Sequence, residues 1–120
     1  MTETHPQPDG LPLSALDLQV LLVLSREDLY GYAIMKEVEL RSDGLLSPEI
    51  GSLYRVLGRL MDQGWAAEAP PPPGAMEGGR GKPRKYYRIT DAGLSVARAE
   101  LRRMEEVLRQ VRRLGPEVAG

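Results

Sequence analysis

The sequence contains no cysteine, no phenylalanine and a single histidine, His5. Without cysteine the chain has no disulfide, no thiolate metal site and no thiol nucleophile, and this composition fits a reducing compartment. The acidic candidates for catalysis, Glu37, Glu39 and Asp43, lie around a helix end with no base partner and no phosphate-binding loop. We interpret them as a solvated acidic face. The sequence therefore predicts a protein that is not an enzyme and that holds no metal or cofactor.

Long apolar runs are missing as well. The longest one, residues 20–24, has five residues, whereas about 18 are needed to cross a bilayer. The first ten residues lack the positive region and the apolar region of a secretion signal. With 120 residues, of which 42% are hydrophobic and 28% charged, the chain predicts one soluble domain in the cytoplasm without membrane contact.

The formal net charge of −1, from 16 basic and 17 acidic residues, hides an uneven distribution. Residues 1–79 carry 5 basic and 12 acidic side chains, a net of −7, whereas residues 80–120 carry 11 basic and 5 acidic ones, a net of +6. Five cations fall between Arg80 and Arg88 with no acid among them. Because the potential at the contacting face matters more than the total charge, this segment predicts contact with a polyanion. The alternative is a solvated loop.

The N-terminal part predicts a tail followed by a buried helix. Residues 1–12 contain three prolines and Gly10 and are expected to be disordered. Ser14 can cap a first helix, in which residues 16–24 are apolar on nearly every side. Such a helix is buried on two faces. Because one domain offers one core, we expect the second face to meet a partner.

Two further helices follow. The second starts around Gly31 and runs to about Leu40, although the Tyr30-Gly31-Tyr32 sequence is also compatible with a tight turn and packing rings. Ser47-Pro48-Glu49 is typical of a helix start, with a capping hydroxyl, a proline at the first helical position and an acid in the first turn. Gly64 suits the C-cap of this third helix.

A hairpin and a last helix complete the pattern. Residues 65–69 and 84–90 predict two short strands around a proline- and glycine-rich loop at 70–83. The last helix runs from Thr90 or Asp91 to about Leu114. The four prolines at 70–73 favour a stiff spacer over a ligand for a proline-recognition domain.

This order of elements predicts a mainly α fold with a small β-hairpin, organised as a winged helix-turn-helix domain over residues 13–90. The hairpin loop at 70–83 is its wing, a C-terminal helix covers 91–114, and a short tail covers 115–120. In such a domain the third helix enters the DNA major groove and the wing lies along the backbone.

The third helix has two different faces on a helical wheel. One face is apolar and contains Ile50, Leu53, Leu57, Leu60 and Met61. Ser52, Arg55 and Arg59 gather opposite, where arginines can contact phosphates or guanine edges. Tyr54 falls at the border, so that its ring can pack while its hydroxyl reaches a phosphate. On an isolated helix these charges would be interpreted as solvated, but the order of elements favours contact with DNA.

A set of motifs stands in a specific order over residues 15–114. They are Leu21-Leu22 with Leu24, Tyr30-Gly31-Tyr32, Gly51-Ser52-Leu53-Tyr54 with Leu57 and Leu60, Gly64, and Lys85-Tyr86-Tyr87-Arg88-Ile89-Thr90-Asp91-Ala92-Gly93. Together they resemble the PadR family of bacterial transcriptional regulators. The resemblance implies a homodimeric winged-helix repressor of a pseudo-palindromic operator, which often releases the operator when it meets a small-molecule effector.

The resemblance also implies DNA contact by side chains of the second helix, the third helix and the basic wing. Together with the two arginines from the wheel, the expected DNA-binding residues are Tyr32, Lys36, Ser52, Tyr54, Arg55, Arg59, Arg80, Lys82, Arg84 and Lys85. A single C-terminal helix matches the short subfamily, whose members dimerise through that helix and the first one.

The last helix carries an apolar seam whose residues alternate in steps of three and four. The seam consists of Leu94, Ala97, Leu101, Met104, Leu108 and Val111. Glu105 and Arg109 are expected to pair on its outer side. We expect the seam to form a dimer interface with the partner's first helix, through Leu16, Val20 and Val23. The alternative is that the last helix packs back on its own domain.

Some residues depart from the family pattern, and others are open to two interpretations. Many members have proline directly after the motif tyrosine, where this chain has Arg55, which adds a cation to the reading face. No aromatic residue follows Tyr87, which disfavours a stacking drug pocket at the dimer centre. We interpret Trp65 as a core residue rather than an effector contact. The competing function is a winged-helix module for protein or RNA contact without operator binding.

Overall fold

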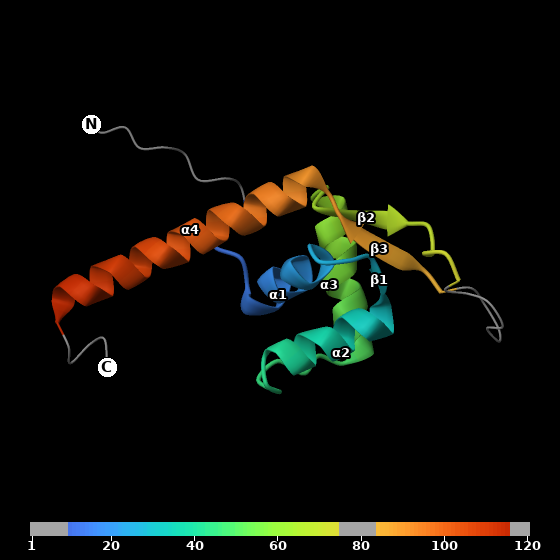
Figure 1. Ribbon diagram of the computed structural model, residues 1–120, viewed down its shortest axis with the longest axis horizontal. Coiled ribbons are helices and arrows are strands. Elements are labelled where there is room, and N and C mark those ends of the chain that lie inside the picture. The colour runs from blue at the N-terminus through green and yellow to red at the C-terminus, as the bar shows by residue number, and fades with distance from the viewer. Residues whose placement is uncertain (1–9, 75–83, 116–120) are drawn as a thin grey trace.

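The computed structural model describes residues 10–74 and 84–115. In that part of the chain the elements follow in the order α1 (Ala15–Leu24), β1 (Leu29–Tyr30), α2 (Gly31–Arg41), α3 (Ile50–Asp62), β2 (Ala66–Ala69), β3 (Tyr86–Ile89) and α4 (Asp91–Leu114) (Figure 1). The predicted mainly α fold is confirmed, and the helices and the two hairpin strands lie within a few residues of their expected bounds.

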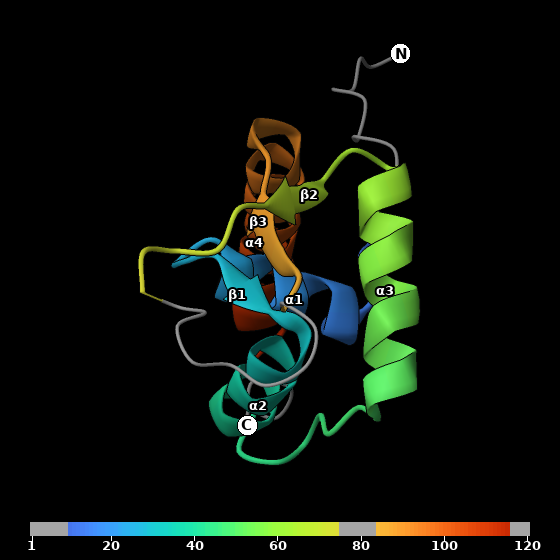
Figure 2. The same cartoon turned by 90° about the vertical axis from the view of Figure 1, so that its right-hand side faces the viewer.

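α1 lies at the centre of the domain. Figure 1 shows it between α4 and α2, and Figure 2 shows α3 standing along one side of it. Val20 and Leu21 are completely buried, and Val23 and Leu24 are only 2% exposed. Its own chain therefore covers most of the apolar surface of this helix, and Leu16, Gln19 and Leu22 remain half-buried. Val20 and Val23 therefore have no surface left for a partner, which corrects the expectation that they form part of a dimer interface.

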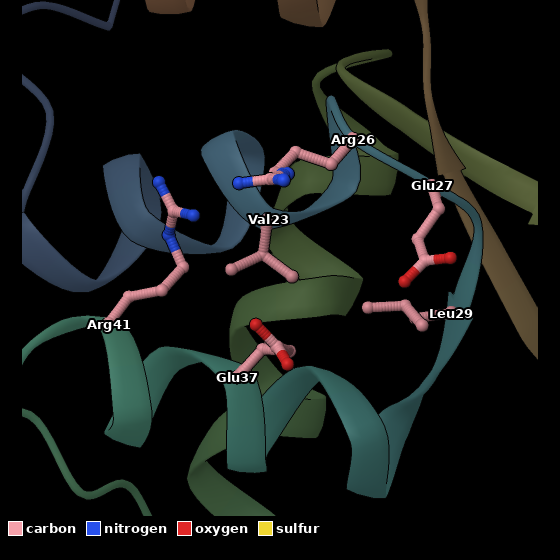
Figure 3. Close-up of a pocket in the computed structure, with 6 residues that line it drawn as sticks. All are labelled: Val23, Arg26, Glu27, Leu29, Glu37 and Arg41. Atoms are coloured by element: carbon pink, nitrogen blue, oxygen red, sulfur yellow. The ribbon is translucent and has the colours of Figure 1, made fainter.

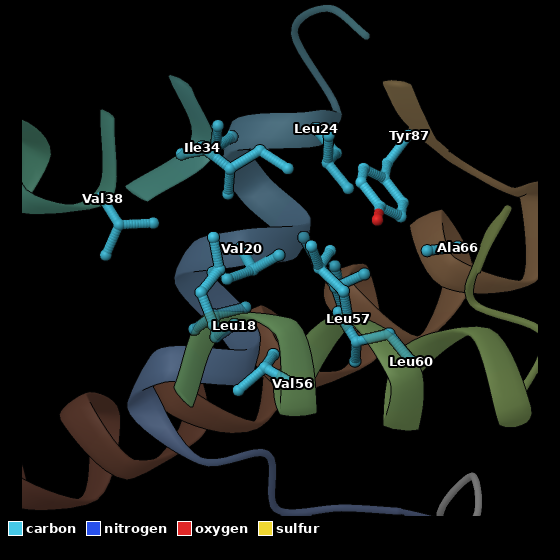
Figure 4. Close-up of a cluster of buried hydrophobic side chains, with 14 of the residues drawn as sticks. Leu18, Val20, Leu24, Ile34, Val38, Val56, Leu57, Leu60, Ala66 and Tyr87 are labelled. Atoms are coloured by element: carbon cyan, nitrogen blue, oxygen red, sulfur yellow. The ribbon is translucent and has the colours of Figure 1, made fainter. Parts of the chain in front are cut away.

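The core around α1 combines side chains from every layer (Figure 4). Its labelled members are Leu18, Val20, Leu24, Ile34, Val38, Val56, Leu57, Leu60, Ala66 and Tyr87. α3 contributes side chains to this core from its central turns and not from its two ends. Ile50 and Met61, which the wheel placed on the apolar face, are 42% and 36% exposed.

The sheet has three strands rather than the two of the expected hairpin. β3 lies in the middle and pairs antiparallel with β1 and with β2. Tyr86 is opposite Tyr30 of β1 on one side and opposite Ala69 of β2 on the other. The Tyr30-Gly31-Tyr32 sequence is therefore not a free turn: Tyr30 ends a strand and Gly31 begins α2. This edge connects the start of α2 directly to the wing.

Capping explains where α1, α3 and α4 begin or end. The hydroxyls of Ser14 and Thr90 accept the N–H groups of the third helical residues of α1 and α4, each at 3.0 Å. Gly64 has φ +79°, and the next N–H donates to the Leu60 carbonyl at 2.9 Å, which closes α3 with a Schellman motif. These three ends are as predicted.

The start of α3 differs from the prediction. The helix begins at Ile50 with Glu49 as its N-cap, so Pro48 lies outside it. The Ser47 hydroxyl donates to the Glu39 carboxylate at 2.9 Å. Ser47 therefore ties the connection to α2 instead of capping α3, which moves the helix start two residues beyond the expected proline.

The segment before α1 is packed, although residues 10–12 were expected to belong to a disordered tail. Leu11 is partly buried against the core and Leu13 is buried. Gly10 lies directly against the ring of Trp65, because a Cβ built on it would be 2.4 Å from the ring atom Cη2. Trp65 packs against the core. Residues 1–9 of the expected tail lie outside the described residues.

α4 packs on the domain with its first half only. Val96, Ala97 and Ala99 are buried, whereas Leu101 is 40% exposed and Leu108 is 54% exposed. Figure 1 shows the second half extending past α1, away from the sheet. Packing on its own domain, the alternative reading of this helix, therefore applies to the first half. Ala97 belongs to the domain core and not to a free seam.

We expect Gly93→Ala to destabilise the fold, because a Cβ at Gly93 would be 2.0 Å from the Trp65 carbonyl oxygen, part of the backbone at the root of β2. The loss should be about 1–3 kcal/mol in urea unfolding. Gly58→Ala in α3 is the matched control, since a Cβ there meets nothing within 4 Å and should add about 0.5–1 kcal/mol. Equal stability of the two variants would contradict the close approach of α4 to β2.

Candidate nucleic-acid interface

Three segments that are far apart in the sequence meet at one cleft of about 360 Å³. They are the start of α2, the first half of α3 and the segment that enters β3. The cleft is lined by Tyr30, Gly31, Tyr32, Tyr54, Arg84 and Lys85. Four of the expected DNA-binding residues, one from α2, one from α3 and two from the wing, thus line the same cleft.

Gly31 allows Tyr54 to lie over the start of α2. A Cβ at Gly31 would be 2.6 Å from the Tyr54 hydroxyl oxygen and 2.8 Å from Cζ. Tyr54 is 49% exposed and Tyr32 is 53% exposed, so both present surface at the cleft. Sequence reasoning identified both tyrosines but not Gly31, and the glycine between two tyrosines at a helix start was the available signal.

Two cations stand at the entrance of the wing. The guanidinium of Arg84 lies over the Tyr30 ring, 4.4 Å from its centroid, which is a cation–π contact. The Tyr30 ring in turn meets Tyr86 edge-on with centroids 5.5 Å apart. Lys85 Nζ is 4.0 Å from the Glu68 carboxylate, and both side chains are more than half exposed, so this pair is weak. Sequence reasoning missed Tyr30, which holds Arg84 in place.

The start of α2 adds positive potential to the cleft. Its N-cap, Tyr30, makes no side-chain capping bond, and the first turn contains no acid. The N–H groups of a helix start carry a partial positive charge and bind anions. Lys36 lies one turn further along, 5.9 Å from the Tyr32 ring centroid and 3.7 Å from Glu39. The cleft is therefore suited to an anionic oxygen such as a phosphate.

The exposed face of α3 continues from this cleft. Arg55 Nη2 donates to the Ser52 hydroxyl at 3.1 Å, one turn apart on the helix. This bond uses one of the five guanidinium donors. Arg55 is exposed and Ser52 is half-buried, so the pair lies where the wheel predicted a polar face.

Arg59 makes an ion pair within the protein that the sequence did not predict. Its Nη2 lies 2.5 Å from Asp17 Oδ1 at the start of α1. The Asp17 side chain is 11% exposed and that of Arg59 is 52% exposed. Moving the guanidinium to DNA would leave a buried carboxylate without its cation, at a cost of about 1–3 kcal/mol. Arg59 therefore helps to hold α3 on α1, and its contact with DNA stays a prediction.

Tyr87 lies beneath this surface as part of the core. Burial raises the pKa of its hydroxyl, and the charges of Tyr54 and Glu68 raise it further. The side chain therefore stays neutral and contributes packing rather than charge. Two expected contacts, Arg80 and Lys82, lie outside the described residues.

A second cleft, of about 200 Å³, lies between α1 and α2 (Figure 3). Its lining is formed by Val23, Arg26, Glu27, Leu29, Glu37 and Arg41. Glu37 and Arg41 project from the side of α2 opposite Tyr32, because they follow it by five and nine residues in a 3.6-residue helix. This cleft is therefore separate from the one at the wing. In the described residues no group of His, Asp or Glu is arranged to hold a metal ion, and no helix is long and apolar enough to cross a membrane.

Comparison with known proteins places the chain among transcriptional regulators. The family described as transcriptional regulator PadR-like matches residues 20–99. A PadR family transcriptional regulator from Eggerthella lenta is 36% identical, with a TM-score of 0.58 over 82% of this chain and 86% of that one. A transcriptional regulator from Clostridium thermocellum is 25% identical, with a TM-score of 0.66 over 84% and 90%. No curated protein matches the chain.

Bacillus subtilis PadR in complex with operator DNA shares the fold, with a TM-score of 0.60 at 23% identity. The match covers 73% of this chain and 47% of that one. At this level of identity the likeness concerns the fold alone.

The two arginines of α3 should respond differently to removal. Arg59→Ala leaves the buried Asp17 carboxylate unpaired and should lower the free energy of unfolding by about 1–3 kcal/mol. Arg55→Ala, on the same helix one turn earlier, removes an exposed pair and should change it by less than about 0.5 kcal/mol. Urea unfolding of both variants measures these changes in the free energy of unfolding. An Arg59→Ala protein as stable as the wild type would contradict the structural role of the Asp17–Arg59 pair.

Proposed function

Because the chain belongs to the PadR-like family of transcriptional regulators, we propose that it is a homodimeric repressor that binds operator DNA. In this proposal the cleft shared by α2, α3 and the wing binds the sugar-phosphate backbone of the DNA, and α3 lies in the major groove. The observation that carries the proposal is the meeting of Tyr32, Tyr54, Arg84 and Lys85 at one cleft. A cytoplasmic location follows, since an operator is part of the chromosome.

The chemistry of the cleft fits a phosphate of the DNA backbone. A phosphate oxygen would receive hydrogen bonds from the start of α2 and from the tyrosine hydroxyls, with Arg84 and Lys85 supplying charge. Such contacts fix where the protein sits on the duplex but do not read the sequence. Their place beside α3 means that one anchored phosphate sets the depth of α3 in the groove.

Sequence would be read by the exposed face of α3. Arg55 is oriented by Ser52 at 3.1 Å, and an arginine presented in this way can bind guanine through O6 and N7. The motif of the family resemblance often has proline at this position, so Arg55 gives this regulator a contact of its own. We therefore propose that Arg55 contributes to the operator preference.

A protein or RNA partner is the competing function, and the shape of the site favours duplex DNA. The exposed face of α3 and the cationic cleft lie side by side. Duplex DNA presents a matching pair of surfaces, the major groove and the phosphate backbone beside it. A protein of the same fold, PadR of Bacillus subtilis, has been solved with operator DNA, which supports this choice.

The test is binding of the full chain to a duplex from upstream of its own gene, measured by fluorescence anisotropy over a range of salt. We expect Arg84→Ala to weaken binding about tenfold, and to lower the slope of log affinity against log salt by about 0.9, the value for one phosphate. Arg26→Ala, an exposed arginine of the cleft in Figure 3, is the matched control and should leave both unchanged.

Absence of binding at low salt to this duplex and to random duplex would contradict the DNA-binding proposal. Equal effects of the Arg84 and Arg26 changes would contradict the placement of the backbone in the cleft. Binding to single-stranded RNA in preference to duplex would favour the competing function.

The dimer part of the proposal rests on the second half of α4. Its apolar side chains are exposed in the single chain: Leu101, Met104, Val107, Leu108 and Leu114 range from 40% to 66%. They continue the side of the helix that is buried in the first half. A projecting helix with this pattern requires a cover, and a second copy supplies a matching apolar face. Val111 of the same half of α4 is half-buried, as are Leu94 in the first turn of α4 and Leu16 and Leu22 of α1.

We expect Leu108→Glu to convert the dimer to a monomer, because a carboxylate in the apolar interface is costly. Sedimentation at micromolar concentration measures the change, and operator affinity should fall with it because both half-sites are no longer held together. Gln110→Glu adds the same charge on another side of α4 and should remain dimeric. A wild-type protein that sediments as a monomer would rule out this interface.

The family resemblance also implies an effector. α4 contains no aromatic side chain, so a pocket that stacks planar ligands between the two α4 helices is not part of the proposal.

A further inference from the structure

The cleft between α1 and α2 in Figure 3 is not used by the DNA-facing surface. Its volume of about 200 Å³ equals that of about six water molecules at about 30 Å³ each, so it has room for a small organic molecule. The apolar part of its lining consists of Val23, which is 2% exposed, and the half-buried Leu29. The remaining lining residues are all charged: Arg26, Glu27, Glu37 and Arg41.

The charged groups of this cleft are not paired with one another. Over residues 10–74 and 84–115, three ion pairs join side chains one turn apart on a helix, but no ion pair includes a residue of this cleft. Glu37 and Arg41 stand four residues apart with the acid first, the order that favours a pair on a helix. They nevertheless point apart: Figure 3 shows the Arg41 side chain extending from α2 toward α1, whereas the Glu37 carboxylate lies below Val23.

The two signs of charge occupy different places in the cleft. In Figure 3 the guanidinium groups of Arg26 and Arg41 lie on one side of Val23 and the carboxylate of Glu37 on the other. A guanidinium group binds a carboxylate through two parallel N–H donors. A carboxylate such as that of Glu37 accepts from an ammonium group. The cleft can therefore bind a negative and a positive group at once.

The balance of charge selects among small ligands. Two arginines and two glutamates give this lining no net charge. A simple anion would be attracted by the arginines but repelled by the glutamates, and a metal ion would be repelled by the arginines. A zwitterion satisfies both signs. An α-amino acid is a zwitterion of the right size, and its side chain would meet the apolar part of the lining.

We propose that this cleft is a binding site for a small α-amino acid. The carboxylate of the ligand binds Arg26 and Arg41, its ammonium group binds Glu37, and its aliphatic side chain packs on Val23 and Leu29. The ligand would thereby join the end of α1 to the middle of α2. This proposal depends neither on a dimer nor on operator binding.

The test is a titration of the isotope-labelled full chain with L-valine, followed by the backbone amide signals in NMR. We expect saturable shifts concentrated at the lining residues, with a dissociation constant on the order of 1 mM for so small a ligand. 3-Methylbutanoate is valine without the ammonium group, and 2-methylpropylamine is valine without the carboxylate. Each should bind at least about tenfold more weakly, because a hydrogen-bonded charge is lost.

Two variants test the residues that bind the charges. Arg41→Gln and Glu37→Gln should each weaken valine binding at least about tenfold. Arg98→Gln and Glu105→Gln are the matched controls and should leave it unchanged. Both control residues are exposed on α4, and α1 lies between α4 and α2 (Figure 1).

Absence of saturable shifts at the cleft up to about 20 mM valine, well above the expected constant, would overturn the proposal. Equal affinity for valine and 3-methylbutanoate would overturn it as well, since the cleft would then bind any carboxylate. Unchanged valine binding in both cleft variants would show that these charges are merely solvated. The comparison of the three compounds uses the wild type alone, so it does not depend on the folding of a variant. A protein that binds operator DNA but not valine would contradict this site only.

Discussion

The burial of the central apolar side chains of α1 by its own chain is the constraint on which the rest of the structure depends. α2, α3, α4 and β3 all pack on this one helix, so each is placed relative to the others through it. Leu21 and Val20 have no exposed surface, and packing at this density allows little independent movement. The cleft at the wing is a consequence: α2 and α3 meet at Gly31 and Tyr54 because both lie on the same central helix.

Polar contacts add a defined position of one helix against another, which apolar packing alone specifies less closely. The Asp17–Arg59 pair joins the start of α1 to α3, whereas the Glu100–Arg103 pair lies within α4. Both use a carboxylate that is shielded from water and an arginine that is partly exposed. The first pair helps to set the position of the proposed reading helix, α3, on α1. Charge in this domain thus stabilises the packing of α3 on α1 as well as contributing to the proposed contact with DNA.

Most of the fold could be predicted from local patterns. Ser14, Thr90 and Gly64 each act through neighbours within a few residues, and their helix ends are where the sequence predicted them. The features that the sequence did not predict are those in which a side chain or a strand has its partner in another element of the fold. Arg59 looks like a free cation on a wheel because Asp17 is 42 residues away, and Ser47 looks like a cap although Glu39 binds its hydroxyl. β1 has two residues and pairs with a strand beyond the wing. The apolar surface of α1 was attributed to a partner because a sequence does not show how many elements surround a helix.

In the proposed complex the cleft of Tyr32, Tyr54, Arg84 and Lys85 holds one backbone phosphate. This can be tested with a scan of the upstream duplex in which single phosphates are replaced by neutral methylphosphonates, with binding measured for the wild type and for Arg84→Ala. We expect one position per half-site at which the neutral group weakens binding of the wild type about tenfold and binding of the variant hardly at all, since the variant already lacks the Arg84 side chain that meets this phosphate. Equal losses for both proteins at every position would contradict it.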